Sequence, residues 1–551
     1  MFVVIVRKRA LFWVPILVFL TLGAVLTILA WLIGPAPAPR LGLASAFPHL
    51  ARGLFPGYQF GEVILDEPSR LLEKLSRSEL DYLLELGRPT EGLVSWPVGY
   101  LVPAVVVPFF DSRQMLDLQS LQQAILSTPE EVLVAQELAV PGYPWWDAPV
   151  RYLESGEIAE ELREGRGGFG IILLQERKPA VRVLPLEGVD PRDCAAHPLA
   201  YPLTRTIYLS QRPKGLAGQL RDWVQNRLQS PVNAFRLLAL GTPYAQPWAG
   251  EITLVAVGDI MLDRDVKKAG LRNGWEYMFA ETASFLRGAD VSFANLESPL
   301  GDRGRFINMF QAPPEAVEGL AFAGLDVVSL ANNHALDYHH EGLLETMRLL
   351  REYGIDWVGA GRNLQEARAP LIREVGGVSI GFLAYTEMWF VYSREPISWR
   401  ATAEEPGVAP AELDQIVEDV QKLRELVDVV VVSMHWGKEY VHEPTPEQMR
   451  LARAAADAGA DLIVGHHPHV LQGLEFYNQS VIAYSLGNFV FDLNLPSTWE
   501  TMLLEFTLSE QGVRDLAILP ARIFGVQPRI LDGAPREAAY QRIRQYSLNL
   551  R

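Results

Sequence analysis

The loop Gly465–Val470, with the sequence GHHPHV, places three of the chain's ten histidines within four positions. Pro468 favours an extended backbone at the residue before it, so we expect His467 and His469 to be held on a stiff loop. Neutral imidazoles beside carboxylate and amide oxygens form a mixed site that suits Zn, Mn or Fe. The loop therefore predicts part of a divalent-metal site, in which His466 has no assigned role.

Similar polar residues stand just past four other apolar segments that have the β-branched composition of buried strands. They are Asp259 after ITLVAVG, Glu297 after VSFANL, Asn333 and His334 after VVSLAN, and His435 after VVVVSM. Open α/β sheets place their ligand sites at the carboxyl ends of strands. We therefore expect five strand ends to converge on one metal-binding edge.

Each of these motifs has a simpler structural interpretation when it stands alone. Gly258-Asp259 is typical of a turn or a helix N-cap, and the asparagines of NLE and NNH tolerate turn conformations. A single histidine after a strand, such as His435, is usually a hydrogen-bonded and partly buried imidazole. The combination of two carboxylates, one amide and three histidines at five strand ends favours the metal site.

The elements that must position these residues form an α/β pattern after residue 250. Short strand patterns alternate with helical patterns such as HEGLLETMRLLREYG and TPEQMRLARAAADAG. Strands that alternate with helices predict βα units and a largely parallel or mixed sheet.

Six motifs in this half resemble the CapA family of capsule-synthesis proteins, also called PgsA, which is associated with bacterial poly-γ-glutamate capsule production. The motifs are GDIMLDR, NLESPL, SLANNHALDY, MHWGKEY, GHHPHVLQG and SLGNFVFD, within about residues 251–500. That family is similar in turn to calcineurin-like metallophosphatases. The resemblance implies a β-sandwich flanked by helices (α/β/β/α), with two divalent ions at the strand ends. The implied metal ligands are Asp259, Glu297, Asn333, His435, His467 and His469, with His334 as general acid or transition-state stabiliser.

Two positions depart from the metallophosphatase pattern. Those enzymes carry Asp-x-His in the first motif, whereas the third position here is Met261. A thioether does not replace a hard imidazole as a ligand for Mn or Mg. Glu297 also stands where those enzymes use Asp. The resemblance therefore implies metal binding but leaves a fully active binuclear centre open.

Arg264 lies near the first motif and has two equally good interpretations. Its guanidinium is suited to clamp a phosphate or carboxylate of a substrate. It is equally suited to a surface ion pair with Asp263 or Asp265.

Other polar residues are expected close to the predicted ligands. Asp337 and Glu439 are near enough in sequence to His334 and His435 to orient an imidazole. Asn488 follows another strand and is expected at the same edge, with no assigned role. The remaining histidines of this half are expected to be solvated: His339, His340 and His442.

The N-terminal segment Leu11–Ile33 has 23 residues without a charge, and a bilayer core needs about 20. The basic residues Arg7, Lys8 and Arg9 precede it, which places the short N-terminus in the cytoplasm and the rest outside. A cleavable signal peptide has a shorter apolar region of about 7–15 residues. We expect a cytoplasmic N-terminus (1–10), a transmembrane anchor (11–33), a Pro-rich spacer (34–44), a smaller α/β domain (45–240), a linker (241–250) and the CapA-like domain (251–551).

The smaller domain, 45–240, mixes strand and helix patterns. The segments YLVPAVVVPF, GFGIILL and AVRVLPL predict strands, while SRLLEKLSRSELDYLLELG and SLQQAILSTPEEVLVAQEL predict helices. This domain faintly resembles phosphate-binding members of the periplasmic solute-binding proteins. A degenerate version that serves as a spacer or docking domain is the simpler interpretation.

Charge and cysteine content limit the partners of the chain. With 49 basic and 66 acidic residues, the net charge of −17 argues against binding to nucleic acid. The single cysteine, Cys194, excludes an intrachain disulfide framework. The expected partners are the bacterial membrane, an anionic capsule polymer or phosphoester substrate, and other capsule-synthesis proteins.

Three classes of function follow from these patterns. The first is a membrane-anchored, extracytoplasmic component of capsule poly-γ-glutamate biosynthesis with a metallophosphatase-type metal site. The second is a metal-dependent phosphoester hydrolase of the cell envelope that is unrelated to polyglutamate. The third is a non-catalytic module that binds or exports the polymer. The chain lacks a GxxxxGK[ST] loop, so we do not expect it to perform ATP-dependent ligation itself.

Overall fold

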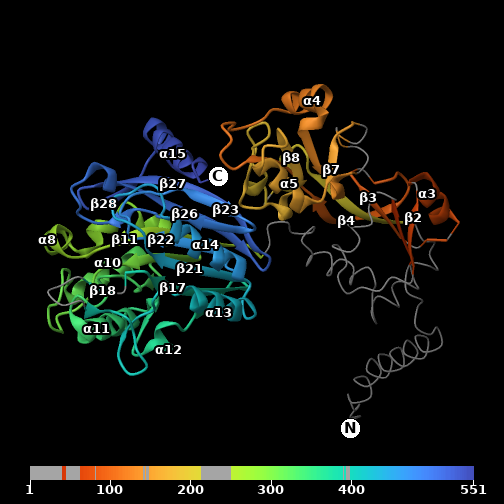
Figure 1. The fold of residues 1–551 in the computed structure, drawn as a ribbon. Coiled ribbons are helices and arrows are strands. Elements are labelled where there is room, and N and C mark those ends of the chain that lie inside the picture. The colour runs from red at the N-terminus through yellow and green to blue at the C-terminus, as the bar shows by residue number, and fades with distance from the viewer. Residues whose placement is uncertain are drawn as a thin grey trace, which may run out of the picture. The chain divides into compact units, whose positions relative to one another are not determined.

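The structure, a computed structural model, describes residues 40–44, 62–212 and 250–550, apart from positions 67, 78, 81, 88, 140–142, 144, 146–147, 196, 389 and 392–396. The chain forms two compact units. The second unit runs from Gly250 and also takes in the short segments Pro108–Ser112 and Arg177–Arg182. In Figure 1 the part of this unit from Gly250 onward is coloured from green to blue.

The predicted membrane anchor, 11–33, lies outside the described residues, as do most of the spacer 34–44 and most of the linker 241–250. Among the helices that are described, none combines the length and the apolar character that a bilayer crossing requires.

Two mixed five-stranded sheets belong wholly or mostly to the first unit. One has the order β2 (Glu62–Asp66), β1 (Arg40–Ala44), β3 (Tyr82–Leu86), β10 (Arg205–Gln211) and β4 (Val94–Leu101). The other has the order β7 (Arg151–Leu153), β6 (Val132–Ala135), β8 (Phe169–Leu173), β5 (Pro103–Pro108) and β9 (Val181–Val183). The helices of this unit are α3 (Pro68–Ser76), α4 (Leu118–Ser127) and α5 (Ser155–Arg163).

Two helical predictions in this unit are correct only for their first halves. The segment 69–87 begins in α3 but ends as β3, which pairs with β10. The segment 120–138 begins in α4, but Pro129 follows the helix end and the buried run Val132–Ala135 is a strand. Proline cannot continue a helix, and burial between neighbouring strands outweighs helix propensity.

The second unit is built around an eight-stranded and a six-stranded sheet. The first has the order β14 (Asp356–Val358), β13 (Val327–Ser329), β12 (Val291–Leu296), β11 (Ile252–Ile260), β26 (Glu500–Ser509), β27 (Gly512–Phe524) and β28 (Gln527–Ile530), with β25 (Asn488–Val490) also paired to β11. The second has the order β16 (Leu371–Val375), β17 (Val378–Thr386), β21 (Val429–His435), β22 (Leu462–His466), β24 (Ser480–Ala483) and β23 (Leu474–Tyr477).

Helices and short strand pairs complete this unit. The helices are α8 (Arg264–Asn273), α9 (Ala283–Leu286), α10 (Val317–Ala323), α11 (His339–Glu352), α12 (Leu364–Ala367), α13 (Leu413–Arg424), α14 (Pro446–Ala458) and α15 (Gly533–Leu548). The short pairs are β15 (Ala360–Gly361) with β20 (Gly407–Val408), and β18 (Phe390–Val391) with β19 (Ile397–Ser398).

Alternation along the strands explains how the sheets stack. Successive side chains of a strand point to opposite faces. In β11, Leu254 and Ala256 pack with residues of the second sheet, whereas Val255 and Val257 pack with residues of α8, α10 and α11. Each face of the eight-stranded sheet therefore has its own core.

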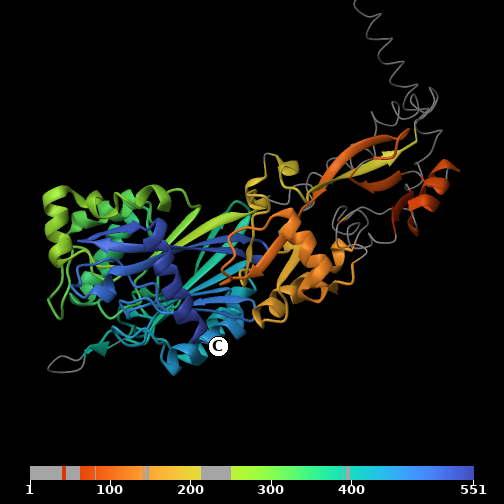
Figure 2. The same ribbon diagram turned by 90° about the horizontal axis from the view of Figure 1, so that it is seen from above.

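The six-stranded sheet repeats this pattern. Val431 of β21 faces the first sheet, and Val432 packs with residues of α13 and α14. Between the sheets, the rings of Phe293 and Phe382 stack with centroids 5.8 Å apart. Helices α8, α10 and α11 lie on one side of the strands and α13 and α14 on the other (Figure 1), and Figure 2 shows the same arrangement from above. The predicted mixed α/β fold is confirmed, in four layers.

The strand directions bring the predicted site residues to one edge. Strands β11, β12 and β13 are parallel, and so are β17, β21 and β22. In this register Asp259 lies opposite Asn295 of β12 and Asn488 of β25, while His435 lies opposite His466. The carboxyl ends of the parallel strands in both sheets therefore carry the polar side chains.

Candidate metal centre

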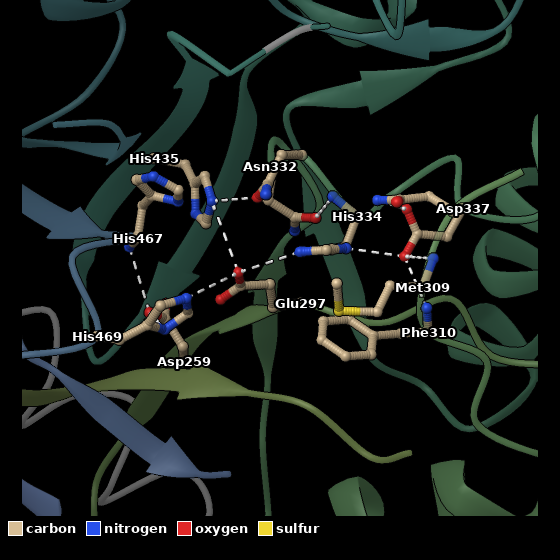
Figure 3. Close-up of polar contacts among 12 residues, drawn as sticks. Asp259, Glu297, Met309, Phe310, Asn332, His334, Asp337, His435, His467 and His469 are labelled. Carbon is tan, nitrogen blue, oxygen red and sulfur yellow. Dashed lines mark hydrogen bonds and ion pairs between the residues drawn. The ribbon is translucent and has the colours of Figure 1, made fainter. Parts of the chain in front are cut away.

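Glu297, just after β12, lies at the middle of the site (Figure 3). Its carboxylate is fully buried, and neither oxygen has a hydrogen-bond partner among the described residues. Its Oε1 atom lies 4.0 Å from Nε2 of His334, 3.8 Å from Nε2 of His435 and 3.7 Å from Nε2 of His469. These gaps are too long for hydrogen bonds. Two metal–ligand bonds of about 2.0–2.2 Å each span such a gap.

Burial gives Glu297 an unfavourable environment for its charge. Removal from water raises its pKa well above the ordinary value, and the nearby carboxylate of Asp259 adds to the shift. A buried charge without a partner is costly in free energy. A divalent cation beside Glu297 offsets that cost, so the donor set fits a metal.

Asp259, near the end of β11, has many polar partners. Its Oδ1 accepts a hydrogen bond of 2.9 Å from Nδ2 of Asn295, and its Oδ2 accepts one of 3.2 Å from the backbone N–H of His467. Nδ1 of His466 lies 3.1 Å from Oδ1, and Nδ1 of His469 lies 3.5 Å from Oδ2. Burial opposes ionisation, but these imidazoles hold the pKa of Asp259 well below its usual range.

His435 ends β21 and is buried against two asparagines. Its Nε2 lies 2.7 Å from Oδ1 of Asn333, and its Nδ1 lies 3.3 Å from Nδ2 of Asn295. Burial lowers the pKa of His435 well below its ordinary value, and the neighbouring ring of His467 adds to this effect. The imidazole is therefore neutral, which is the form that binds a metal.

Two site residues were missed by the sequence reasoning. Asn295 links Asp259 to His435, and its own Oδ1 accepts a hydrogen bond of 3.1 Å from Nδ2 of Asn332. Asn332 in turn accepts a hydrogen bond from the backbone N–H of His334. Both asparagines stand inside the NLE and NNH motifs, so their position next to predicted ligands was the available signal.

The GHHPHV loop has a different backbone from the one we predicted. His467 has a φ of 91° and His469 a φ of 57°, so the prediction of an extended His467 is wrong. Such values are strained for residues other than glycine and cluster at functional sites. The hydrogen bond from the His467 backbone to Asp259 helps to hold this conformation. Burial lowers the pKa of His467 to about 3.

His334 and Asp337 form a buried pair beside Glu297. Nδ1 of His334 lies 2.8 Å from Oδ2 of Asp337. That carboxylate also accepts hydrogen bonds from the backbone N–H groups of Met309 and Phe310, which fix its position (Figure 3). This contact leaves Nε2 of His334 on the side of Glu297, 4.0 Å from its Oε1.

The geometry groups these side chains into two buried triads that share Glu297. One triad is Glu297, His435 and His467, and the other is Asp259, Glu297 and His469, with ligand atoms within 4.8 Å of one another in each. A third group joins His467 and His469 to the exposed Glu439. Each triad combines imidazole and carboxylate donors, which suit a divalent ion. Five of the six predicted ligands thus come together, and the sixth, Asn333, lies against His435, with its Oδ1 2.7 Å from Nε2 of that ring.

Arg264 has a different partner from those we expected. Its guanidinium forms an ion pair with Asp492, not with Asp263 or Asp265. It also lies over the rings of Phe310 and Phe491, at 4.9 Å and 5.6 Å from their centroids.

These two rings connect Arg264 to the metal centre. The ring centroid of Phe310 lies 4.3 Å from that of His334, and the centroid of Phe491 lies 4.9 Å from that of His469. The ring of Phe310 therefore connects Arg264 to His334, and the ring of Phe491 connects it to the predicted ligand His469.

Residues around the predicted ligands occupy varied positions. Oδ1 of Asn488 lies 2.8 Å from Nδ1 of His469, which gives this asparagine an orienting role. His466 is fully buried beside Asp259. Glu439, which we predicted beside His435, groups with His467 and His469.

Met261 does not take part in the site. It is fully buried in the core cluster that contains residues of α8, and its sulfur lies 3.0 Å from the backbone N of Asp263. The thioether at this position is a packing group rather than a ligand.

The other histidines of this unit lie away from the predicted ligands. His339 and His340 are half-buried at the start of α11. His442, which we expected to be solvated, is also half-buried: its Nδ1 lies 2.8 Å from the Leu471 carbonyl oxygen, and its ring stacks on Tyr546.

Two solved structures show distant likenesses to this chain. An ABC-type phosphate transport receptor from Vibrio cholerae is 12% identical, with a TM-score of 0.29. The match covers 37% of this chain and 98% of the receptor. A hypothetical protein from Thermus thermophilus is 16% identical, with a TM-score of 0.33, and covers 49% and 98% respectively. TM-scores this low support no conclusion about fold or function.

Comparisons of sequence are more specific. The model of the family described as "Bacterial capsule synthesis protein PGA_cap" matches residues 253–493. The capsule biosynthesis protein CapA of Bacillus anthracis is 36% identical over 295 residues, which cover 52% of this chain and 70% of that protein. The PGA biosynthesis protein CapA of Bacillus subtilis (strain 168) is 34% identical over 294 residues, which cover 52% and 76%. The chain therefore belongs to the CapA family of bacterial capsule synthesis proteins.

Proposed function

We propose that this chain acts in the biosynthesis of a poly-γ-glutamate capsule and carries a divalent-metal centre of metallophosphatase type in its second unit. Family membership supports the capsule role, since the relatives are named for capsule and PGA biosynthesis. The observation that carries the metal centre is Glu297, whose buried carboxylate has three imidazole nitrogens at 3.7–4.0 Å and no hydrogen-bond partner among the described residues.

The residues that would hold the ions are Asp259, Glu297, Asn333, His435, His467 and His469. Divalent ions bound by these residues would supply Lewis acidity, which withdraws charge from an ester or acyl oxygen and makes water a better nucleophile. Zn, Mn and Fe all suit the mixture of imidazole, carboxylate and amide donors.

His334 is the candidate proton donor to the leaving group. Asp337 holds its Nδ1, so Nε2 is the nitrogen that faces the centre. Asn332 fixes the backbone of His334 through a hydrogen bond of 3.0 Å. A general acid needs such orientation, because proton transfer depends first on geometry. This pair favours hydrolytic chemistry on a phosphoester or a related envelope bond over a purely passive binding module.

We further propose that residues 11–33 anchor the chain in the bacterial membrane, with the N-terminus in the cytoplasm and both units outside. The support is the run of 23 uncharged residues after Arg7, Lys8 and Arg9. Such a chain stays in the membrane pellet after alkaline carbonate extraction, and external protease digests it in spheroplasts. Release by carbonate contradicts the anchor.

Complementation tests the capsule role. A Bacillus subtilis strain that lacks its own CapA is given the full-length chain, and secreted γ-linked polyglutamate is measured. We expect the wild-type chain and a Glu475→Gln control to restore polymer, because Glu475 pairs with Arg453 away from the predicted ligands. Glu297→Gln is expected to fail while it is present at normal levels. Restoration by Glu297→Gln to the wild-type level contradicts a role for the metal centre.

A further inference from the structure

A pocket of about 410 Å³ lies next to the Arg264–Asp492 ion pair. Asp492 lines this pocket, together with Trp499, Arg522 and Phe524. Arg264 of this ion pair lies over Phe310 and Phe491, the two rings that pack against His334 and His469. A short stretch of chain, Phe491-Asp492, therefore connects the metal centre to the pocket.

Arg522 is the notable group in this pocket. Its half-buried guanidinium lies over two aromatic rings, 5.4 Å from the centroid of Trp499 and 6.0 Å from that of Phe524. Among the described residues this guanidinium has no hydrogen-bond or ion-pair partner. Glu500 lies opposite Arg522 in the register of β26 and β27, but it pairs with Arg542. A guanidinium whose face stacks on aromatic rings keeps its N–H edge free for an anion.

The two carboxylates of the pocket are already neutralised. Asp492 pairs with Arg264 and accepts a hydrogen bond of 2.9 Å from the backbone N–H of Asp265. Asp265 itself pairs with Lys268 at 2.8 Å. Neither carboxylate of the pocket is therefore left to pair with Arg522, although the whole chain carries a net charge of −17. A local cation on an acidic protein selects for an anionic ligand at that spot.

We propose that this pocket is a subsite for an anionic polymer chain, and that Arg522 binds the carboxylate of one repeat unit while another unit reaches the metal centre. The inference rests on the proposed function, and it adds a binding position outside the metal centre. A planar guanidinium matches a carboxylate through paired hydrogen bonds. The rings of Trp499 and Phe524 cover the aliphatic and amide parts of the same unit.

The test uses the full-length chain in detergent with its metals bound. Its probes are fluorescein-labelled γ-linked glutamate oligomers of increasing length, read by fluorescence anisotropy. We expect Arg522→Gln to weaken binding of long oligomers by about 10-fold or more, because a charge-assisted contact is lost. Bound metal should stay unchanged.

Arg529→Gln is the matched control. Arg529 also lies over Phe524, at 5.5 Å, but it pairs with Glu281 and does not line the pocket. Removal of this charge should leave oligomer affinity unchanged. Equal losses in both variants overturn the subsite, since they indicate a general charge effect. Arg522→Lys keeps the charge but loses the planar guanidinium that stacks on the rings. Its affinity for the oligomers is expected to lie between those of wild type and Arg522→Gln. This variant replaces Arg522→Gln in the test if Arg522→Gln fails to fold.

The remaining outcomes separate this inference from the proposed function. Wild-type affinity in Arg522→Gln overturns the subsite and leaves the capsule role intact. A wild-type chain that binds no oligomer overturns both. Inorganic phosphate is the competing oxyanion. If phosphate protects Arg522 from phenylglyoxal and oligomers do not, the pocket binds phosphate and the polymer subsite is wrong.

Discussion

Oδ2 of Asp337 lies 2.8 Å from Nδ1 of His334 and also accepts hydrogen bonds from the backbone N–H groups of Met309 and Phe310. One carboxylate therefore fixes both the candidate proton donor and the loop whose aromatic ring packs against it. The orientation of His334 depends on a contact that no metal ion supplies.

Asp337→Asn tests this orientation. We expect turnover of a chromogenic phosphodiester to fall about 10- to 100-fold, as for other residues that orient an active imidazole. Bound metal should change little, because Asp337 belongs to neither triad. The exposed Asp457→Asn serves as the control and should match wild type. Normal turnover in Asp337→Asn rules out an orienting role for this carboxylate.

Metal removal is expected to destabilise the second unit. Glu297 and Asp259 are fully buried carboxylates whose charges are best balanced by cations. A chelator should lower the melting temperature of the full-length chain by about 5 °C or more, and added Zn or Mn should restore it. Glu297→Gln should show a smaller response. A melting temperature that no chelator or metal affects contradicts the centre.

The buried ring of His467 should cost the metal-free chain stability as the pH falls below neutral. Burial holds the pKa of His467 at about 3, whereas a histidine in an unfolded chain titrates near 6.5. Between these values the unfolded state binds a proton that the folded state does not. The contribution of His467 to the free energy of unfolding is therefore greatest above about pH 6.5 and decreases by about 1.4 kcal/mol per pH unit below it.

Urea denaturation across this range, with chelator present, measures that slope. His467→Asn should give a shallower dependence than wild type. The exposed histidine His197 offers a control, since His197→Asn should leave the slope unchanged. If all three chains have the same slope, His467 does not stay neutral in the folded protein.

A substitution at Gly258 tests whether the ends of β11 and β25 must lie as close together as they do. A Cβ atom at this position would lie 2.0 Å from the backbone oxygen of Gly487, so alanine pushes β25 away from β11. We expect Gly258→Ala to cost about 2–3 kcal/mol of stability and to reduce bound metal. Gly156→Ala, in α5, has open space around the new Cβ and is the control. Wild-type metal content in Gly258→Ala shows that this approach is not needed.

The sequence carried enough local information to predict the strands of the second unit and the residues at their ends. Runs such as VVVVSM are buried on both faces, and a polar residue directly after such a run is readily detected. Segments that fold by tertiary contact were harder. Tyr82–Leu86 has a helical pattern but pairs with β10 as a strand, because its neighbours bury it.

Partners that lie far apart in the chain were missed for a similar reason. Asp492 is 228 positions from Arg264, and no spacing rule connects them. Asn295 owes its role to the register of β12 against β11, which places it opposite Asp259. The positive φ of His467 likewise reflects contacts within the site rather than the local preference set by Pro468.

Metal analysis of the full-length chain is the most direct test of the central claim. The protein is purified in detergent, loaded with Zn or Mn, dialysed and measured by inductively coupled plasma mass spectrometry, beside Glu297→Gln and the control Glu475→Gln. Two triads that share Glu297 predict about two ions per chain in wild type and control, and a loss of both in Glu297→Gln. Equal metal content in wild type and Glu297→Gln, or no bound metal in wild type, would contradict the account.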